Sequence, residues 1–148
     1  MVGRLPLRGQ GEGLIPLPGA QTDSAWQGFI PMEQLPRVID PPGGYVAGAN
    51  ARVQPPGVEP LISADNAPGY REGRLRDVLS GDTGFDLDAM QQLQTDVRSN
   101  QARTLLPRML PALAGASRDA LGERSRELLA GWARDPEQAA SAAAPLIF

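Results

Sequence analysis

The sequence contains no cysteine, no histidine and no lysine. Without cysteine there are no disulfides, no thiolate nucleophile and no cysteine-based metal site. Without histidine there is no imidazole base, no Ser-His-Asp triad and no ordinary zinc cluster. The missing cysteines leave the compartment open, because an oxidising environment permits disulfides without demanding them. Several common catalytic sites are therefore excluded from these 148 residues.

An excess of basic charge and long apolar runs are lacking as well. The net charge is -3, and arginines are scattered among aspartates and glutamates, so no basic stripe could neutralise successive phosphates. No run approaches the roughly 18 apolar residues of a membrane span, and the N-terminal residues lack the apolar core of a secretory signal. We therefore expect a soluble chain with neither nucleic acid nor a membrane as a partner.

Aromatic residues are few, with three Phe, two Tyr and two Trp, which predicts a thin core. Proline and glycine are abundant and unevenly placed: residues 1–69 hold most of the 15 Pro and 17 Gly. Long helices cannot form at that density, so we predict short strands and ordered turns there. The length suits one domain, so a multi-part enzyme would have its remainder elsewhere.

The second half of the chain has helical periodicity. Tyr70 to Leu79 fits a short helix, and Asp86 is expected to be the N-cap of a longer one. Pro107 and Pro111 should bend or end that longer helix near Leu106, because each removes a backbone donor. Its apolar positions are Leu87, Met90, Leu93, Val97 and Leu105.

A further helix is predicted from Arg118 to Ala133. The last stretch, Gln138 to Phe148, is alanine-rich and is expected to be helical as far as Pro145. A strand-and-loop segment at 1–69 followed by a helical segment at 70–148 predicts an α+β fold rather than repeated βαβ units. The expected buried stripe of the Arg118 helix consists of Leu121, Leu128, Leu129 and Trp132.

Three short motifs that could carry chemistry are better explained as local structure. Gly9-Gln10-Gly11-Glu12-Gly13 lacks the lysine of a phosphate loop, and its glutamate would repel phosphate. Asp82-Thr83-Gly84 matches the aspartic-protease tripeptide but follows a turn instead of an apolar strand. Asp86, Asp88 and Asp96 could be imagined as metal ligands, yet the first two suit a helix start, where negative charge is favoured.

The most specific feature is a longer series of ordered pieces. In chain order they are Gly3-Arg4-Leu5-Pro6-Leu7-Arg8, Pro18-Gly19, Trp26-Gln27-Gly28-Phe29-Ile30-Pro31, Leu35-Pro36, Pro41-Pro42-Gly43-Gly44-Tyr45-Val46-Ala47-Gly48-Ala49-Asn50, Tyr70-Arg71-Glu72-Gly73-Arg74-Leu75 and Met90-Gln91-Gln92-Leu93-Gln94-Thr95-Asp96-Val97-Arg98-Ser99. In order and approximate spacing they resemble the penicillin amidase (penicillin acylase) family. The family more often has Asn in place of Asp40, and a second Asn or another polar residue in place of Ala51.

The resemblance implies an N-terminal nucleophile hydrolase with an αββα fold. In this family a processed serine becomes the first residue of the large (beta) subunit and attacks an amide carbonyl, while its own α-amino group acts as the base. An α-amino group suits that task, since its unperturbed pKa is about 7.7 to 8.0. The chain would be an internal segment of the large subunit without the nucleophile. Residues 1–69 would belong to the amidase sheet and residues 70–148 to its helices.

The resemblance also assigns two site residues. Asn50 matches the asparagine whose side-chain amide donates to the tetrahedral oxyanion. Arg71 matches an arginine placed near the nucleophile, where a fixed positive charge keeps the amino group unprotonated. Judged from the residues alone, Asn50 could be a turn former after Gly48-Ala49, and Arg71 could be a helix-surface charge.

The complete protein is then expected to hydrolyse a linear amide, removing the acyl group from a β-lactam side chain, an acyl-homoserine lactone or a similar molecule. Implied partners are the small subunit, the nucleophile-bearing part of the large subunit and the amide substrate, in the periplasm or outside the cell. No cofactor is expected. Some family members bind calcium, but mostly through carboxylates outside this segment, and in this chain Ser63 stands near the position where such a carboxylate is expected. The chain alone should be inert. The alternative is a non-enzymatic interaction or structural module derived from the family.

Overall fold

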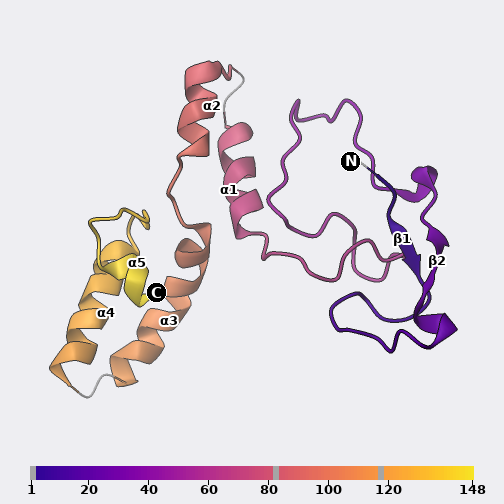
Figure 1. Ribbon diagram of the computed structural model, residues 1–148. Helices are drawn as coiled ribbons and strands as arrows, with labels where there is room; N and C mark the ends of the chain where they lie inside the picture. The colour runs from indigo at the N-terminus through magenta and orange to yellow at the C-terminus, as the bar shows by residue number, and fades with distance from the viewer. Residues whose placement is uncertain (1–2, 82–83, 117–118) are drawn as a thin grey trace. The chain divides into compact units, whose positions relative to one another are not determined.

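The structure is a computed structural model that describes residues 3–81, 84–116 and 119–148. It contains two compact units, residues 1–69 and residues 70–148. The first is built from a short antiparallel β-sheet and loops, and the second from α-helices. The chain is therefore α+β, with the strands first and the helices second (Figure 1). In the described ranges no helix combines the length and the apolar character needed to cross a membrane.

The first unit contains two paired strands, β1 (Pro6–Arg8) and β2 (Trp26–Phe29). They pair antiparallel, with Pro6 opposite Phe29 and Arg8 opposite Trp26, so β2 carries one more residue than β1 between these pairs. This bulge contains Gly28 at φ 121°, a backbone conformation that residues with a Cβ rarely adopt. The glycine of the Trp26-Gln27-Gly28-Phe29 piece is thereby explained by the sheet itself.

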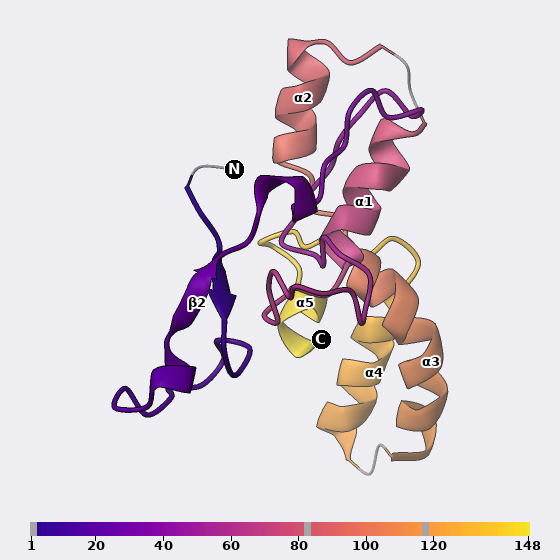
Figure 2. The ribbon, with the colours of Figure 1, turned by 90° about the vertical axis from the view of Figure 1, so that its right-hand side faces the viewer.

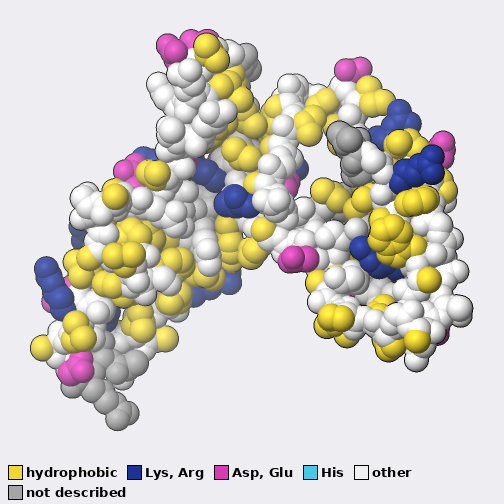
Figure 3. All heavy atoms as spheres, viewed as in Figure 1, with side chains coloured by type: hydrophobic (Ala, Val, Ile, Leu, Met, Phe, Trp, Pro, Cys, Tyr) yellow, Lys and Arg dark blue, Asp and Glu magenta, His cyan; other side chains and the backbone are white. Residues whose placement is uncertain are grey.

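Apolar side chains of the first unit are largely exposed. Only Ile30 and Leu35 are buried hydrophobic residues in its described part, whereas Trp26 is 65% exposed although it stands in a strand. Figure 3 shows hydrophobic side chains across the surface of this unit. The thin core expected from composition is confirmed here. Further exposed apolar residues of this unit are Leu14, Ile15, Met32, Val38, Ile39, Val46 and Val53.

The described residues of the second unit form five helices: α1 (Tyr70–Leu79), α2 (Leu87–Gln94), α3 (Asn100–Ala116), α4 (Ala120–Trp132) and α5 (Ala144–Ile147). Helices α3 and α4 lie side by side, and α5 packs against α4 (Figures 1 and 2). The predicted helix at Tyr70 to Leu79 is confirmed. The predicted N-cap is confirmed too, because the Asp86 carboxylate accepts from Ala89 N–H at 2.8 Å.

The single long helix predicted after Asp86 is wrong, because the chain leaves the helix after Gln94 and enters α3 at Asn100. Side chains at the break compete with helical bonds: Thr95 Oγ1 donates to a carbonyl of α2 at 3.1 Å. The segment then pairs with a distant one. Ser99 N–H donates to Pro136 O at 2.8 Å. A tertiary hydrogen bond therefore takes the place of helix continuation.

Of the two predicted effects of Pro107 and Pro111, a bend or an end of the helix, the end is wrong, since both lie inside α3. They are exposed residues, and the carbonyls left without an intrahelical donor belong to Arg103 and Pro107, which are exposed themselves. Water can therefore satisfy those carbonyls. The opposite face of α3 carries the buried Leu106, whose packing offsets the cost of the prolines.

The helix predicted from Arg118 to Ala133 is present as α4, which begins at Ala120, where the Asp119 carboxylate accepts from Gly122 N–H at 2.7 Å. Arg118, the predicted start, lies outside the described residues. The alanine-rich stretch is not helical up to Pro145. Instead this proline lies in the first turn of α5, where its missing N–H costs nothing.

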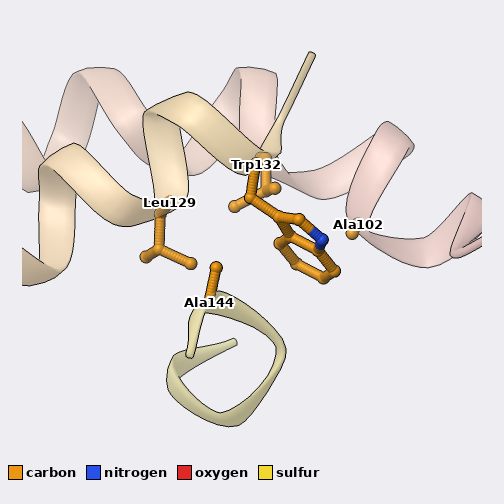
Figure 4. Close-up of a cluster of buried hydrophobic side chains, with 5 residues drawn as sticks. Ala102, Leu129, Trp132 and Ala144 are labelled. Carbon is orange, nitrogen blue, oxygen red and sulfur yellow. The ribbon is translucent and has the colours of Figure 1, made fainter. Parts of the chain in front are cut away.

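The core of the second unit lies between α3, α4 and α5 (Figure 4). Ala102 and Leu106 are fully buried, and Leu129 and Trp132 cover them from α4. The Trp132 indole N–H donates to Glu137 O at 2.7 Å, so its one polar group is satisfied. Of the predicted stripe on α4, Leu128, Leu129 and Trp132 face this core, but Leu121 is 76% exposed. Ala144 of α5 closes the cluster.

Candidate functional site

Asn50 lies in a bend of the first unit, outside the strands and helices. Its φ is 61°, in the left-handed region that Asn adopts more readily than most residues. Asp40 has the same kind of backbone, with φ 46°. The turn-former explanation therefore accounts for the backbone at Asn50. The role of its exposed side chain is a separate question.

The chain that follows Asn50 returns to it. Ala67 N–H donates to Asn50 O at 2.8 Å and closes the loop between them. Inside this loop the buried Gln54 donates from Nε2 to Pro60 O at 2.9 Å and accepts from Ile62 N–H at 3.0 Å. A buried amide bonded at both ends holds the loop in one arrangement. Asn50 thus stands at the closed end of a loop whose arrangement is held by the internal hydrogen bonds of Gln54.

Arg71 is the second residue of α1 in the second unit, and it is exposed. A helix N-terminus carries partial positive charge, so a cation in the first turn is unfavourable, whereas the neighbouring Glu72 suits this position. The helix dipole therefore does not explain the arginine. The structure places Asn50 in the unit at 1–69 and Arg71 in the unit at 70–148.

An ion pair joins α1 to the connection between α2 and α3. Arg74 donates from Nε and Nη2 to the two carboxylate oxygens of Asp96, at 3.1 and 2.6 Å. The two side chains are 23% and 19% exposed. Asp96 Oδ1 also accepts from Arg98 N–H at 3.0 Å. Paired donors of this geometry make one of the stronger ion pairs found in proteins, and this pair links residues 22 positions apart.

The pKa of Asp96 lies below its ordinary value, chiefly because Arg74 donates hydrogen bonds to the carboxylate, and Arg98 N–H adds to this effect while burial opposes it. The pKa of Arg74 is raised by the same hydrogen bonds. Since the folded carboxyl has the lower pKa, the pair contributes its full stability above the unfolded carboxyl pKa of about 3.9, and loses it as the pH falls through the folded value.

Acidification from about pH 5 to about pH 2 is therefore expected to lower the melting temperature of the wild-type helical unit more than that of Asp96→Asn. The variant has no carboxylate to protonate at this position, so it has already lost the contribution. Thermal unfolding followed by far-UV circular dichroism at a series of pH values measures the difference. Parallel pH curves for the two proteins would contradict the assignment.

The other candidate motifs do not form sites in the described part of the chain. The glycine run at 9–13 follows β1 and is not followed by an α-helix, so it lacks the helix N-terminus of a phosphate loop. Asp82 and Thr83 lie outside the described residues. Asp86 caps α2, and Asp96 is bonded to Arg74.

A calcium site does not fit the described residues by themselves. No group of three or more acidic, histidine or cysteine side chains gathers within them, and calcium takes six to eight oxygen ligands. Ser63 Oγ donates to Asp65 O at 2.9 Å, which is a local turn bond.

Comparison with known proteins gives the class of the chain. The family model described as penicillin amidase matches residues 1–148, so the chain belongs to the penicillin amidase family. The predicted resemblance is thereby confirmed. Among its relatives is the Penicillin acylase 2 proenzyme of Pseudomonas sp. (strain SE83), which is 35% identical over 129 residues, covering 87% of this chain and 16% of that protein.

An acyl-homoserine lactone acylase, QuiP of Pseudomonas syringae pv. tomato, is 36% identical over 132 residues, covering 85% of this chain and 16% of the relative. QuiP of Pseudomonas putida is 34% identical over 94 residues, covering 64% of this chain and 11% of the relative. The chain thus spans about 16% of the length of the first two relatives.

Two structural features of the site region escaped sequence reasoning. Gln54 is one of several glutamines in the chain, and nothing in its neighbourhood marks it as buried. Arg74 and Asp96 both stand in the ordered series of pieces, but nothing in the sequence indicates that they pair. An ion pair across 22 residues leaves no local pattern, because it depends on how α1 meets α3.

Proposed function

We propose that the chain is part of an amidohydrolase of the N-terminal nucleophile type, which removes an acyl group from a linear amide. The observation that carries this proposal is the family match over all 148 residues, together with relatives that are named as acylases. In this proposal the nucleophilic serine and its α-amino base come from a part of the enzyme outside these residues. The small subunit and that part of the large subunit are its partners, in the periplasm or outside the cell.

Asn50 supplies an oxyanion donor in the proposed enzyme. Attack on the amide carbonyl places negative charge on the carbonyl oxygen only in the transition state. A side-chain amide is neutral, so it donates to that charge without binding the ground state strongly. The closed loop behind Asn50, with Gln54 bonded at both ends, supports this role, because a donor that is already in place need not reorganise during the reaction.

In the same proposal, Arg71 lowers the tendency of the nucleophile's amino group to become protonated. A guanidinium stays protonated at any physiological pH, and its positive charge disfavours protonation of a nearby amine. The amino group of the nucleophile thereby remains a base near neutral pH. The helix dipole disfavours a cation in the first turn of α1, so the dipole does not account for Arg71, which is consistent with a role in the site.

The substrate class follows the names of the relatives, one a penicillin acylase and two acyl-homoserine lactone acylases. Both names denote removal of an acyl group, which makes an acyl amide the common feature. We propose such an amide as the substrate, with a β-lactam or a homoserine lactone as the amine portion.

The test is reconstitution. The chain alone is expected to hydrolyse neither phenylacetyl nor long-chain acyl amide reporters above buffer, because it lacks the proposed nucleophile and base. Co-expression with the Pseudomonas sp. (strain SE83) acylase lacking its matched segment is expected to give a complex with measurable turnover. Turnover by the purified chain alone, abolished by a substitution within it, would overturn the proposal. A stable monomer with no affinity for the acylase remainder would favour the interaction module.

A further inference from the structure

A cleft of about 180 Å³ lies in the second unit, at the meeting of α1 and α3. One wall is the start of α1, with Tyr70 and Arg71, and the facing wall is residues 98–101, which lead into α3 and form its first turn. Gln138 completes the lining. Figures 1 and 2 both show the first turn of α1 beside the start of α3. Because the walls come from distant parts of the sequence, their separation depends on the contacts that join them.

The Arg74–Asp96 pair is placed to do this. Arg74 stands one helical turn after Arg71, on the same side of α1, so a bond that fixes Arg74 also fixes the direction of the first turn. Asp96 accepts twice from Arg74 and, through Oδ1, from the backbone N–H of Arg98. A single carboxylate therefore holds both walls of the cleft at once.

A second link between α1 and α3 is weaker. Asp77 Oδ2 accepts from Asn100 Nδ2 at 3.0 Å and from Arg103 Nη2 at 3.1 Å. The Asp77 and Arg103 side chains are 43% and 62% exposed, so water screens this link more than it screens the pair at Asp96. Asp77 also stands two turns beyond Arg71, nearer the other end of α1. It can limit the tilt of α1 but does not set the position of the first turn.

We propose that Arg74 and Asp96 are positioning residues that hold Arg71 in its working place against the start of α3. This inference rests on the proposed function, because it assumes that the placement of Arg71 matters for the reaction. Neither member of the pair contacts the substrate in this proposal. Their effect on catalysis passes through α1, and it requires the paired geometry rather than the charges alone.

Amide hydrogen exchange on the intact 148-residue chain tests the coupling without activity. Asp96→Asn is expected to speed exchange roughly 10- to 100-fold at the α1 amides and at Ser99 N–H, because a charge-assisted link between the walls is lost. Exchange in α4 should stay near wild type. The matched control is Arg76→Gln, which removes a pair of the same 2.6 Å length to Glu72 within α1 and crosses no cleft. Equal exchange in Asp96→Asn and wild type would overturn the inference.

Kinetics of the reconstituted amidohydrolase separate positioning from mere stability. Asp96→Asn is expected to lower kcat roughly tenfold at a temperature where the variant is fully folded, with KM little changed. Arg74→Lys keeps the positive charge but cannot make the two parallel hydrogen bonds to Asp96, so it should keep only part of the wild-type kcat. Arg76→Gln should match wild type. A wild-type kcat in Arg74→Lys would overturn the positioning role. So would an Asp96→Asn variant whose melting temperature falls while its kcat stays at the wild-type value.

The two proposals fail in different ways. If Arg71→Gln lowers kcat while Asp96→Asn does not, the role of Arg71 stands and the positioning inference falls. If Arg71→Gln leaves kcat unchanged, the proposed role of Arg71 falls, and any kcat loss in Asp96→Asn must have another route, which overturns the inference as stated. Exchange in the intact chain still reports whether the pair couples the walls.

Discussion

Asn50→Gly in the reconstituted amidohydrolase is expected to lower kcat by roughly 10²- to 10³-fold and to leave KM close to wild type. This is the result of removing one preorganised donor that acts only when the oxyanion forms. Glycine is the informative replacement because it adopts the φ of 61° at this position without strain. Asn50→Ala should lose as much kcat, but it should also cost about 1 kcal/mol of stability through its Cβ.

Asp40→Gly is the matched control for that experiment. Asp40 has a left-handed backbone with φ 46°, so the same replacement relieves the same kind of conformation without touching the proposed donor. Its kcat and KM should equal those of wild type. Steady-state kinetics with an acyl amide reporter and thermal unfolding of both variants make the measurement. A raised KM with unchanged kcat in Asn50→Gly would make Asn50 a binding residue instead of an oxyanion donor.

The sequence predicts well that strands and loops come first and helices second. It predicts less well where the individual helices begin and end. Caps and turn residues act locally, which is why α1 and the Asp86 cap follow from the sequence. The break before α3 does not, because it depends on Ser99 bonding to Pro136. The helix through Pro107 does not either, since packing on the buried face of α3 outweighs a local preference.

The candidate site shows the same division. Asn50 and Arg71 are proposed from the order of pieces that resemble the penicillin amidase family, and no physical pattern in this chain provides that information. Their surroundings are set by long-range contacts, such as Gln54 bonded across its loop and Asp96 bonded to Arg74. Sequence reasoning can therefore nominate residues whose identity is characteristic of a family. It does not reveal the common residue types that hold them in place.

Leu106→Ala is expected to lower the free energy of unfolding of the helical unit by about 2 to 5 kcal/mol, because Leu106 is fully buried and the truncated side chain leaves a cavity. Its neighbours in the core, Leu129 and Trp132 on α4, hold the walls of that cavity apart. The control is Leu121→Ala, the same chemical change at a leucine that helical periodicity assigned to the core but that is 76% exposed. Alanine is also the better helix former, so this variant should stay within about 0.5 kcal/mol of wild type.

Urea unfolding followed by far-UV circular dichroism compares the two leucine variants with wild type under one set of conditions. A shift of the midpoint for Leu106→Ala with an unchanged slope indicates a stability loss and not a change in the surface exposed on unfolding. Equal losses in the two variants would mean that Leu121 is buried in solution, either by another part of this chain or by association. A small loss in Leu106→Ala would mean that α3 and α4 close over the missing methyl groups, and the packing in Figure 4 would then be looser than its contacts imply.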